Sequence, residues 1–158
     1  MKHFTPENFQ RCTLGLLLGR ASAAKDRMLD AHLVDDGVTA AQFKVLIILQ
    51  QFDVDTPAEL CRYLSLDSGS MTRMLDRLEQ KELIQRQRSD ADRRQIRVVL
   101  TDAGLQLANR LPHIGANAMN ELVGVLDPQE LADLERILTK VLVAAGDTLT
   151  MLRIGKMK

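Results

Sequence analysis

Two arginines four residues apart, Arg73 and Arg77, have the type and spacing to bind an anionic partner. Residues four apart on a helix lie side by side, so both guanidinium groups would face the same way. Such a pair can grip phosphate groups, or donate hydrogen bonds to O6 and N7 of guanine in a major groove. Small hydroxyl side chains flank the arginines and would let the helix approach a groove closely: Ser68, Ser70 and Thr72. The alternative is a solvated helix face whose arginines are surface charges.

The segments around this predicted helix favour the nucleic-acid interpretation. Met71, Leu75 and Leu78 recur at helical spacing and predict a buried face opposite the arginines. A short helix over about residues 56–63 comes first, and the turn 64–67 joins the two. This order is typical of a DNA-reading helix-turn-helix unit.

An alternating pattern after the arginine-bearing helix predicts a β-hairpin, the wing of a winged helix-turn-helix. Alternation over residues 83–88 resumes over 96–100, and turn-forming residues fill the interval. The tip would carry Arg93 and Arg94, which suit a narrow minor groove with strong negative potential. We expect Asp92 to stabilise the wing, by pairing with Arg94 or capping the turn, because a free carboxylate there would repel phosphate. A solvated turn of alternating charges is the alternative.

The overall charge of the chain conceals an uneven distribution. Of its 158 residues, 21 are Lys or Arg and 21 are Asp or Glu, so the formal net charge is zero. Residues 62–97 hold nine basic and six acidic side chains, an excess of +3 that the rest of the chain balances. Net neutrality therefore does not exclude a nucleic-acid partner.

Helix-start signals divide the rest of the chain. Three capping boxes pair a short oxygen side chain with a Gln or Glu three residues later: Thr39 with Gln42, Thr56 with Glu59, and Asp127 with Glu130. Apolar residues at helical spacing predict a long first helix over 14–33 and a last helix over 131–152 with nearly heptad spacing. Thr101 caps a further helix, which Pro112 should bend or interrupt.

The expected fold class is mainly α (α+β), a single domain over 1–158. Residues 39–100 would form the winged helix-turn-helix lobe, and 8–34 and 102–154 would form N- and C-terminal dimerisation helices. The reason is that the terminal helices carry apolar stripes that a second copy of the chain would bury most economically. We therefore expect a homodimer.

Several other classes lack support in the sequence. No apolar run approaches the length of a membrane span, and the first residues lack the order of a secretory signal. Two cysteines fit a reducing cytosol, so we expect a cytoplasmic protein with no membrane partner. No His and Cys cluster has metal-ligand spacing, and no nucleophile motif or phosphate-binding loop is present, so we expect no enzyme activity, metal or cofactor. A dimeric protein-interaction module without DNA binding remains an alternative.

Three stretches resemble the MarR family of bacterial transcriptional regulators: residues 38–46, residues 69–78, and Asp92-Arg93-Arg94 followed by Val98-Val99-Leu100-Thr101. The similarity covers nearly the whole chain. It implies a triangular homodimer with two winged lobes at its base and intertwined terminal helices at its apex. It also implies binding to a pseudo-palindromic operator, usually as a repressor, and release by small aromatic or lipophilic effectors.

The resemblance also implies roles for individual residues. Thr72, Arg73 and Arg77 match recognition-helix contacts, Arg94 matches the wing arginine, and Asp92 matches its salt-bridge partner. Positions that line aromatic-anion sites beside the recognition helix in relatives are matched by six residues: Pro57, Ser70, Thr72, Met74, Arg77 and Arg86.

Two departures from relatives concern cysteine chemistry. Gln80 stands where one relative has a metal-responsive cysteine in the recognition helix. Peroxide-sensing members use an N-terminal cysteine near tyrosines; Cys12 is placed by the resemblance in the same helix but about one turn early, with Gly15 at the expected position. The one tyrosine, Tyr63, belongs to the DNA lobe. These departures do not favour redox sensing, but a redox-sensing regulator that uses Cys12 remains an alternative.

Overall fold

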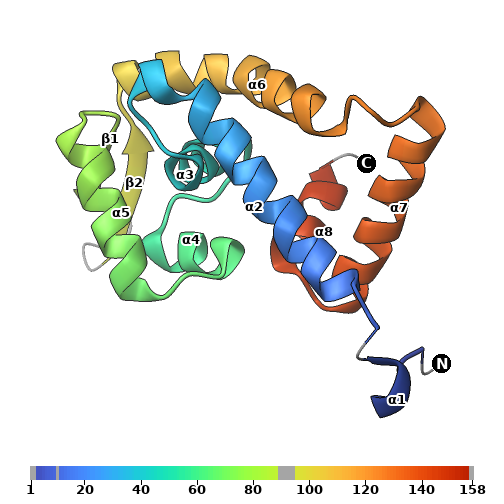
Figure 1. The fold of residues 1–158 in the computed structure, drawn as a ribbon. Helices are drawn as coiled ribbons and strands as arrows, with labels where there is room; N and C mark the ends of the chain where they lie inside the picture. Colours follow the sequence, from blue (N-terminus) through green and yellow to red (C-terminus); the bar gives the residue numbers. More distant parts are fainter. Residues whose placement is uncertain (1–2, 10, 89–94, 157–158) are drawn as a thin grey trace.

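The computed structural model describes residues 3–9, 11–88 and 95–156, and it is mainly helical with one two-stranded sheet (Figure 1). In chain order the elements are α1 (Pro6–Phe9), α2 (Leu14–His32), a 3₁₀ turn η1 (Val34–Asp36), α3 (Ala40–Gln51), α4 (Pro57–Leu64), α5 (Ser68–Gln80), β1 (Ile84–Arg88), β2 (Ile96–Leu100), α6 (Asp102–Val123), α7 (Pro128–Ala144) and α8 (Thr148–Lys156). The expected fold class is confirmed.

Helices α3, α4 and α5 pack with the two strands into one lobe. The predicted capping boxes at Thr39 and Thr56 are both formed and begin α3 and α4. The predicted apolar face of α5 is buried, with Met71, Leu75 and Leu78 each almost fully inaccessible to solvent. Packing α5 against α4 and β1 buries these side chains and turns the opposite face of α5 outward.

The strands form the predicted hairpin. They pair antiparallel with Ile84 opposite Leu100 and Arg88 opposite Ile96. Ile84 and Val98 point into the core, and the backbone N–H of Val98 donates to the carbonyl of Asp55 at 2.6 Å, which attaches β2 to the segment before α4. The tip of the wing lies outside the described residues.

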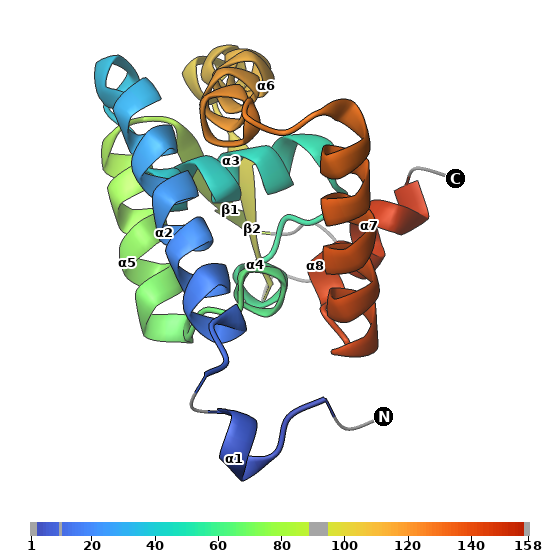
Figure 2. The ribbon, with the colours of Figure 1, turned by 45° about the vertical axis from the view of Figure 1, so that its right-hand side comes forward.

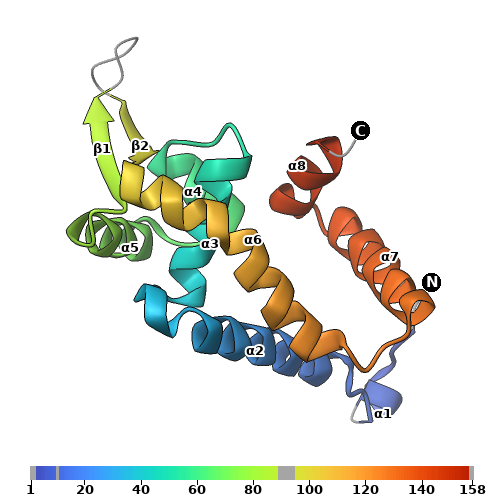
Figure 3. The ribbon, with the colours of Figure 1, turned by 90° about the horizontal axis from the view of Figure 1, so that it is seen from above.

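Helix α6 continues past Pro112 as one helix, so of the two expected effects, a bend or an interruption, the interruption is wrong. A proline removes one main-chain hydrogen bond and crowds the preceding turn. Burial on both sides of it offsets that cost, because Ala108 and Leu111 lie in the core before the proline and Ala118 after it. α6 packs along α2, and Figure 3 shows it crossing from the lobe toward α7.

The C-terminal apolar stripe forms two helices rather than the single one expected. α7 ends at Ala144, Gly146 adopts a left-handed φ of 75°, and the Asp147 carboxylate accepts from the backbone N–H of Thr150 at 2.7 Å at the start of α8. The stripe reverses direction at this glycine, and α8 packs back against α7 and against α4 of the lobe. The predicted capping box at Asp127 is confirmed.

Large apolar side chains remain exposed on the terminal helices of the single chain. On α2 they include Leu14, Leu17 and Leu18, and on α7 Ile137 and Val141, all more than two-fifths exposed. Helix α1 stands apart from the body of the molecule (Figure 2). Among the described residues, no helix combines the length and apolarity required to span a bilayer.

Candidate nucleic-acid interface

The start of α5 is fixed by Asp67. Its carboxylate accepts from the backbone N–H of Ser70 at 2.9 Å and from the Ser70 hydroxyl at 2.6 Å. These hydrogen bonds, with a smaller contribution from the nearby Arg73 guanidinium, hold the pKa of Asp67 below its ordinary value. The preceding turn contains Ser65 in a left-handed conformation, which directs the chain from α4 into α5. The helix N-terminus is thereby presented at the surface.

The exposed face of α5 carries the predicted binding residues. Arg73 and Arg77 both have exposed side chains, and one Arg73 amino group donates to the Ser70 hydroxyl at 3.1 Å. The Thr72 hydroxyl donates to the carbonyl of Ser68, one turn earlier in α5, at 2.8 Å, and Thr72 remains exposed. Arg73 and Arg77 thus project from the face opposite the buried one; Ser68 and Thr72 are also exposed, and Ser70 is half-buried.

Arg86 on β1 lies against this helix and is held by acidic side chains. Its guanidinium group contacts Glu79 at 2.8 Å and Asp76 at 2.7 Å, and it also donates to the Thr72 carbonyl at 3.3 Å. Sequence reasoning assigned Arg86 to an anion site and did not find these two carboxylates. The 79–86 pairing spans the α5–β1 turn, whose geometry was not predictable from spacing.

A cavity of about 250 Å³ lies beside α5 and takes in half of the predicted effector set. Ser70, Met74 and Arg77 line it, together with five other residues: Thr39, Ala41, Gln42, Arg73 and Lys81. Thr72 and Arg86 contact each other instead of lining this cavity, and Pro57 does not line it. This cavity therefore brings together three of the six predicted residues.

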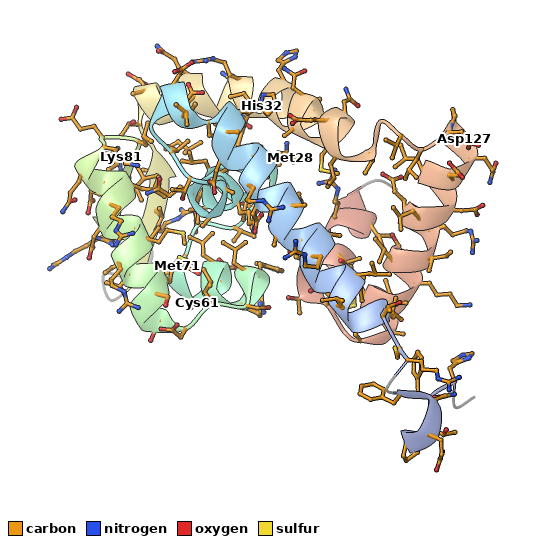
Figure 4. The ribbon with its side chains drawn as sticks, in the orientation of Figure 1. Met28, His32, Cys61, Met71, Lys81 and Asp127 are labelled. Atoms are coloured by element: carbon orange, nitrogen blue, oxygen red, sulfur yellow. The ribbon has the colours of Figure 1, made fainter. Side chains whose placement is uncertain are left out.

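Lys81, at the end of α5, was not singled out by the sequence. Its ammonium group donates to the Gln42 side-chain carbonyl at 2.9 Å and to the Gly37 carbonyl. Gln42 is nearly fully buried and belongs to the capping box of α3. Figure 4 labels Lys81 at the C-terminal end of α5, where it ties this helix to the junction between α2 and α3.

A larger cavity, of about 450 Å³, lies between the lobe and the terminal helices. Apolar side chains from α2, α3 and α6 line most of it: Leu29, Phe43, Ile47, Leu111, Pro112 and Met119. Lys25, Lys44 and Arg153 bring three cations to its lining. Sequence reasoning missed this cavity because its walls come from four separate helices.

One carboxylate, Asp26, shares the two lysines of this cavity. Each ammonium nitrogen lies 3.1 Å from its Oδ1 atom. Burial alone would raise the pKa of Asp26, but the hydrogen bonds and charges of Lys44 and Lys25 outweigh burial and lower it. Two lysines and Arg153 against one carboxylate leave a positive excess at the cavity.

The remaining predicted residues are those of the wing tip and Cys12. Arg93, Arg94 and Asp92 lie outside the described residues. Cys12 is half-buried and precedes α2, which begins at Leu14, so its expected place within that helix is wrong. In the part of the chain that the structure describes, no group of His, Cys, Asp or Glu could hold a metal ion.

Comparison with known proteins identifies the family. A sequence model of the MarR family matches residues 38–96. The multiple antibiotic resistance protein MarR of Escherichia coli is 39% identical over 130 residues, which are 82% of this chain and 90% of that protein. The chain belongs to the MarR family. The HTH-type transcriptional regulator MhqR of Bacillus subtilis, another relative, is 30% identical and is covered over 88% of its length. The chain is therefore a transcriptional regulator and not an enzyme.

Solved structures of the MarR family share the fold. A mutant of E. coli MarR in complex with operator DNA matches with a TM-score of 0.77 at 37% identity, covering 88% of this chain and 99% of that one. A Mycobacterium tuberculosis MarR family protein in complex with p-aminosalicylic acid matches with a TM-score of 0.68 at 28% identity, covering 82% and 98%. The resemblance expected from the sequence is confirmed.

Proposed function

We propose that this MarR-family chain is a cytoplasmic, homodimeric, ligand-responsive repressor that binds a pseudo-palindromic DNA operator. The observation that carries the proposal is the exposed face of α5. Asp67 caps this helix, its apolar face is buried, and Arg73 and Arg77 project from the exposed face. This is the arrangement in which a recognition helix enters a major groove. The match to a relative solved with operator DNA supports the same conclusion.

The exposed apolar faces of α2 and α7 support a homodimer. Soluble proteins rarely leave several large apolar side chains exposed along two helices, and a second copy could cover both faces through two-fold symmetry. A symmetric dimer would place two α5 helices about one turn of DNA apart, roughly 34 Å, which requires a palindromic site. The terminal helices 8–34 and 102–154 would then be the dimerisation elements, and 39–100 the DNA-binding lobe.

The cavity between the lobe and the terminal helices supports an effector site. Its apolar walls suit an aromatic or lipophilic molecule, and its positive excess suits one that carries a carboxylate. Because the cavity borders both the lobe and the terminal helices, an occupant would bias their relative position. Repression is relieved tenfold if the effector favours the non-binding arrangement by about 1.4 kcal/mol. A relative solved with p-aminosalicylic acid supports this class of effector.

A binding experiment with matched variants tests the DNA-binding proposal. A duplex is first selected from a random-sequence library with the wild-type protein, and its affinity is then measured for Arg73→Ala, Arg77→Ala and Arg136→Ala. We expect each α5 substitution to lose about 1 to 3 kcal/mol of specific binding. Arg136 is an exposed α7 residue paired with Asp133. Arg136→Ala removes the same charge away from α5 and should have little effect. Equal losses in all three variants, or failure to select any duplex, would contradict the proposal.

The effector proposal is tested by substituting Arg153, a cation that lines the cavity. Wild-type protein bound to the selected duplex is titrated with benzoate, salicylate and p-aminosalicylate. Arg153→Met should raise the concentration required for release, because it removes a positive charge from the lining while leaving α5 intact. Lys140→Met, on the exposed surface of α7, is the control and should release normally. Identical release curves for both variants would exclude this cavity as the effector site.

A further inference from the structure

Arg86 offers little free hydrogen-bonding capacity at the DNA-binding surface. Glu79 accepts from both its backbone N–H, at 3.0 Å, and its guanidinium group, at 2.8 Å. The other guanidinium amino group contacts Asp76 at 2.7 Å and the carbonyl of Thr72 at 3.3 Å. The Arg86 side chain is 24% exposed, whereas Arg73 and Arg77 are exposed residues. Its donors therefore serve the protein itself.

These contacts join two elements that must act together on DNA. Arg86 lies on β1, two residues after Ile84, so its side chain projects from the same face of the strand as that core residue. On this face of β1, Ile84 is buried in the core and Arg86 forms ion pairs with α5. All three acceptors, at positions 72, 76 and 79, belong to α5. Through them Arg86 links β1 to α5.

We propose that Arg86 is a positioning residue, which Asp76 and Glu79 hold so that the wing and α5 present one rigid surface to DNA. This inference rests on the proposed DNA-binding function. The network has two carboxylates and one guanidinium group, so it contributes negative charge beside Arg73 and Arg77. Negative charge weakens binding to phosphate. A network with net negative charge therefore positions the wing and α5 rather than contacting DNA directly. An anionic effector at Arg86 would have to displace two carboxylates.

The proposal predicts an effect opposite in sign to simple electrostatics. Glu79→Gln removes a negative charge from the DNA-binding surface, which by charge alone should strengthen binding. The N–H and the guanidinium group of Arg86 donate to different oxygens of Glu79, Oε1 and Oε2, and the amide replaces one of these oxygens with an NH₂ donor, so it cannot accept both bonds in this geometry. We expect Glu79→Gln to weaken binding to the selected duplex about tenfold, or about 1.4 kcal/mol.

Glu82→Gln is the matched control. It makes the same charge change three residues later, and within the described residues the Glu82 carboxylate makes no hydrogen bond or ion pair, although its backbone carbonyl accepts from Thr101. Glu82→Gln should bind equally or more tightly than wild type. Unchanged or tighter binding by Glu79→Gln would overturn the positioning role of Arg86.

Arg86→Lys separates positioning from a direct phosphate contact. Lysine retains the positive charge and would still bind phosphate, but it lacks the planar fork that pairs with two carboxylates at once. A positioning role predicts a loss similar to that of Glu79→Gln, and a double variant that loses little more than either single one. Near-normal binding by Arg86→Lys would show that only its charge matters and would contradict the proposal.

A measurement without DNA keeps this test separate from the proposed function. The Arg86 amide hydrogen is bonded to Glu79, so hydrogen exchange there should be faster in Glu79→Gln and unchanged in Glu82→Gln, at equal melting temperature. Failure to select any duplex would refute DNA binding while leaving this exchange difference in place. Equal exchange in wild type and Glu79→Gln would refute the network itself.

Discussion

The Asp67 side chain caps the recognition helix, and the capping hydrogen bonds keep its carboxylate ionised to lower pH. Its carboxylate caps α5 through Ser70, and these hydrogen bonds lower its pKa. A group whose pKa is lower in the folded state stabilises the fold above its unfolded pKa, and this contribution is lost as the pH falls through the folded value.

The titration of Asp67 can be isolated by Asp67→Asn, because asparagine is an equally good N-cap that carries no charge. The wild-type protein should be more stable than the variant near pH 6, and the difference should shrink as the pH falls from about 5 to about 3. Chemical unfolding of both proteins across this range measures it. A difference that stays constant with pH would show that the Asp67 charge contributes nothing.

Gly104 is required by a close approach of two backbone segments. A Cβ atom at this position would lie 1.8 Å from the carbonyl oxygen of Leu83, just before β1. Gly104→Ala should therefore lower the free energy of unfolding by about 2 to 3 kcal/mol, because neither backbone can move without disturbing the core. Gly155→Ala, in a helix with open space around it, should change it by less than about 1 kcal/mol. Equal effects in denaturant titrations would contradict this account.

At the residue scale, the sequence predicted caps and faces but not partners. Thr39, Thr56 and Asp127 were predictable because a capping box is local, within three residues. The contacts of Lys81 reach 44 residues along the chain to Gly37, and no spacing rule connects them. Arg86 was assigned to a ligand site by resemblance, whereas its two acidic partners depend on how β1 lies across α5.

At the element scale, hydrophobic periodicity placed the helices but could not detect where one ends. The apolar spacing passes through Val141, Ala145 and Leu149 without interruption, so the sequence pattern predicts one helix. The break depends on a single backbone conformation, the left-handed Gly146. The same limitation applies to Pro112, whose local preference is overridden by burial of the residues around it.

Gly146→Ala tests the break between α7 and α8. Alanine in a left-handed conformation costs about 1 kcal/mol, and it favours the continuous helix. We expect a lower melting temperature together with higher helix content, measured by circular dichroism. Loss of α8 from the larger cavity should also weaken release by salicylate. An unchanged melting temperature and helix content would contradict the role assigned to this glycine.

At the scale of the whole molecule, a second copy of the chain would cover the exposed apolar face of α2. Leu17→Glu introduces a charge into the exposed apolar face of α2, where Leu17 is 59% exposed in the single chain. Sedimentation should show a dimer for wild type and a monomer for this variant, because a buried unpaired carboxylate is costly. Ile96→Glu is the control, since Ile96 is a 47% exposed apolar residue on β2, in the lobe rather than in the dimerisation helices. A dimeric Leu17→Glu protein would contradict this interface.

Membership of the MarR family could be predicted from three short stretches, because these stretches combine local helix and turn signals with arginines. The cavity between the lobe and the terminal helices could not, because Phe43, Leu111 and Arg153 meet only after the lobe packs on α6 and α8. The sequence therefore predicted the exposed face of α5 but not this cavity.

The central claim is that two α5 helices of a symmetric dimer read one palindromic site. Hydroxyl-radical footprinting of the wild-type protein on the DNA adjacent to its own gene tests this most directly. We predict two symmetric protected segments about one helical turn apart, roughly 34 Å, both lost when Arg77→Ala replaces wild type and both released by salicylate. A single unpaired protected segment, or equal protection by wild type and Arg77→Ala, would contradict the account.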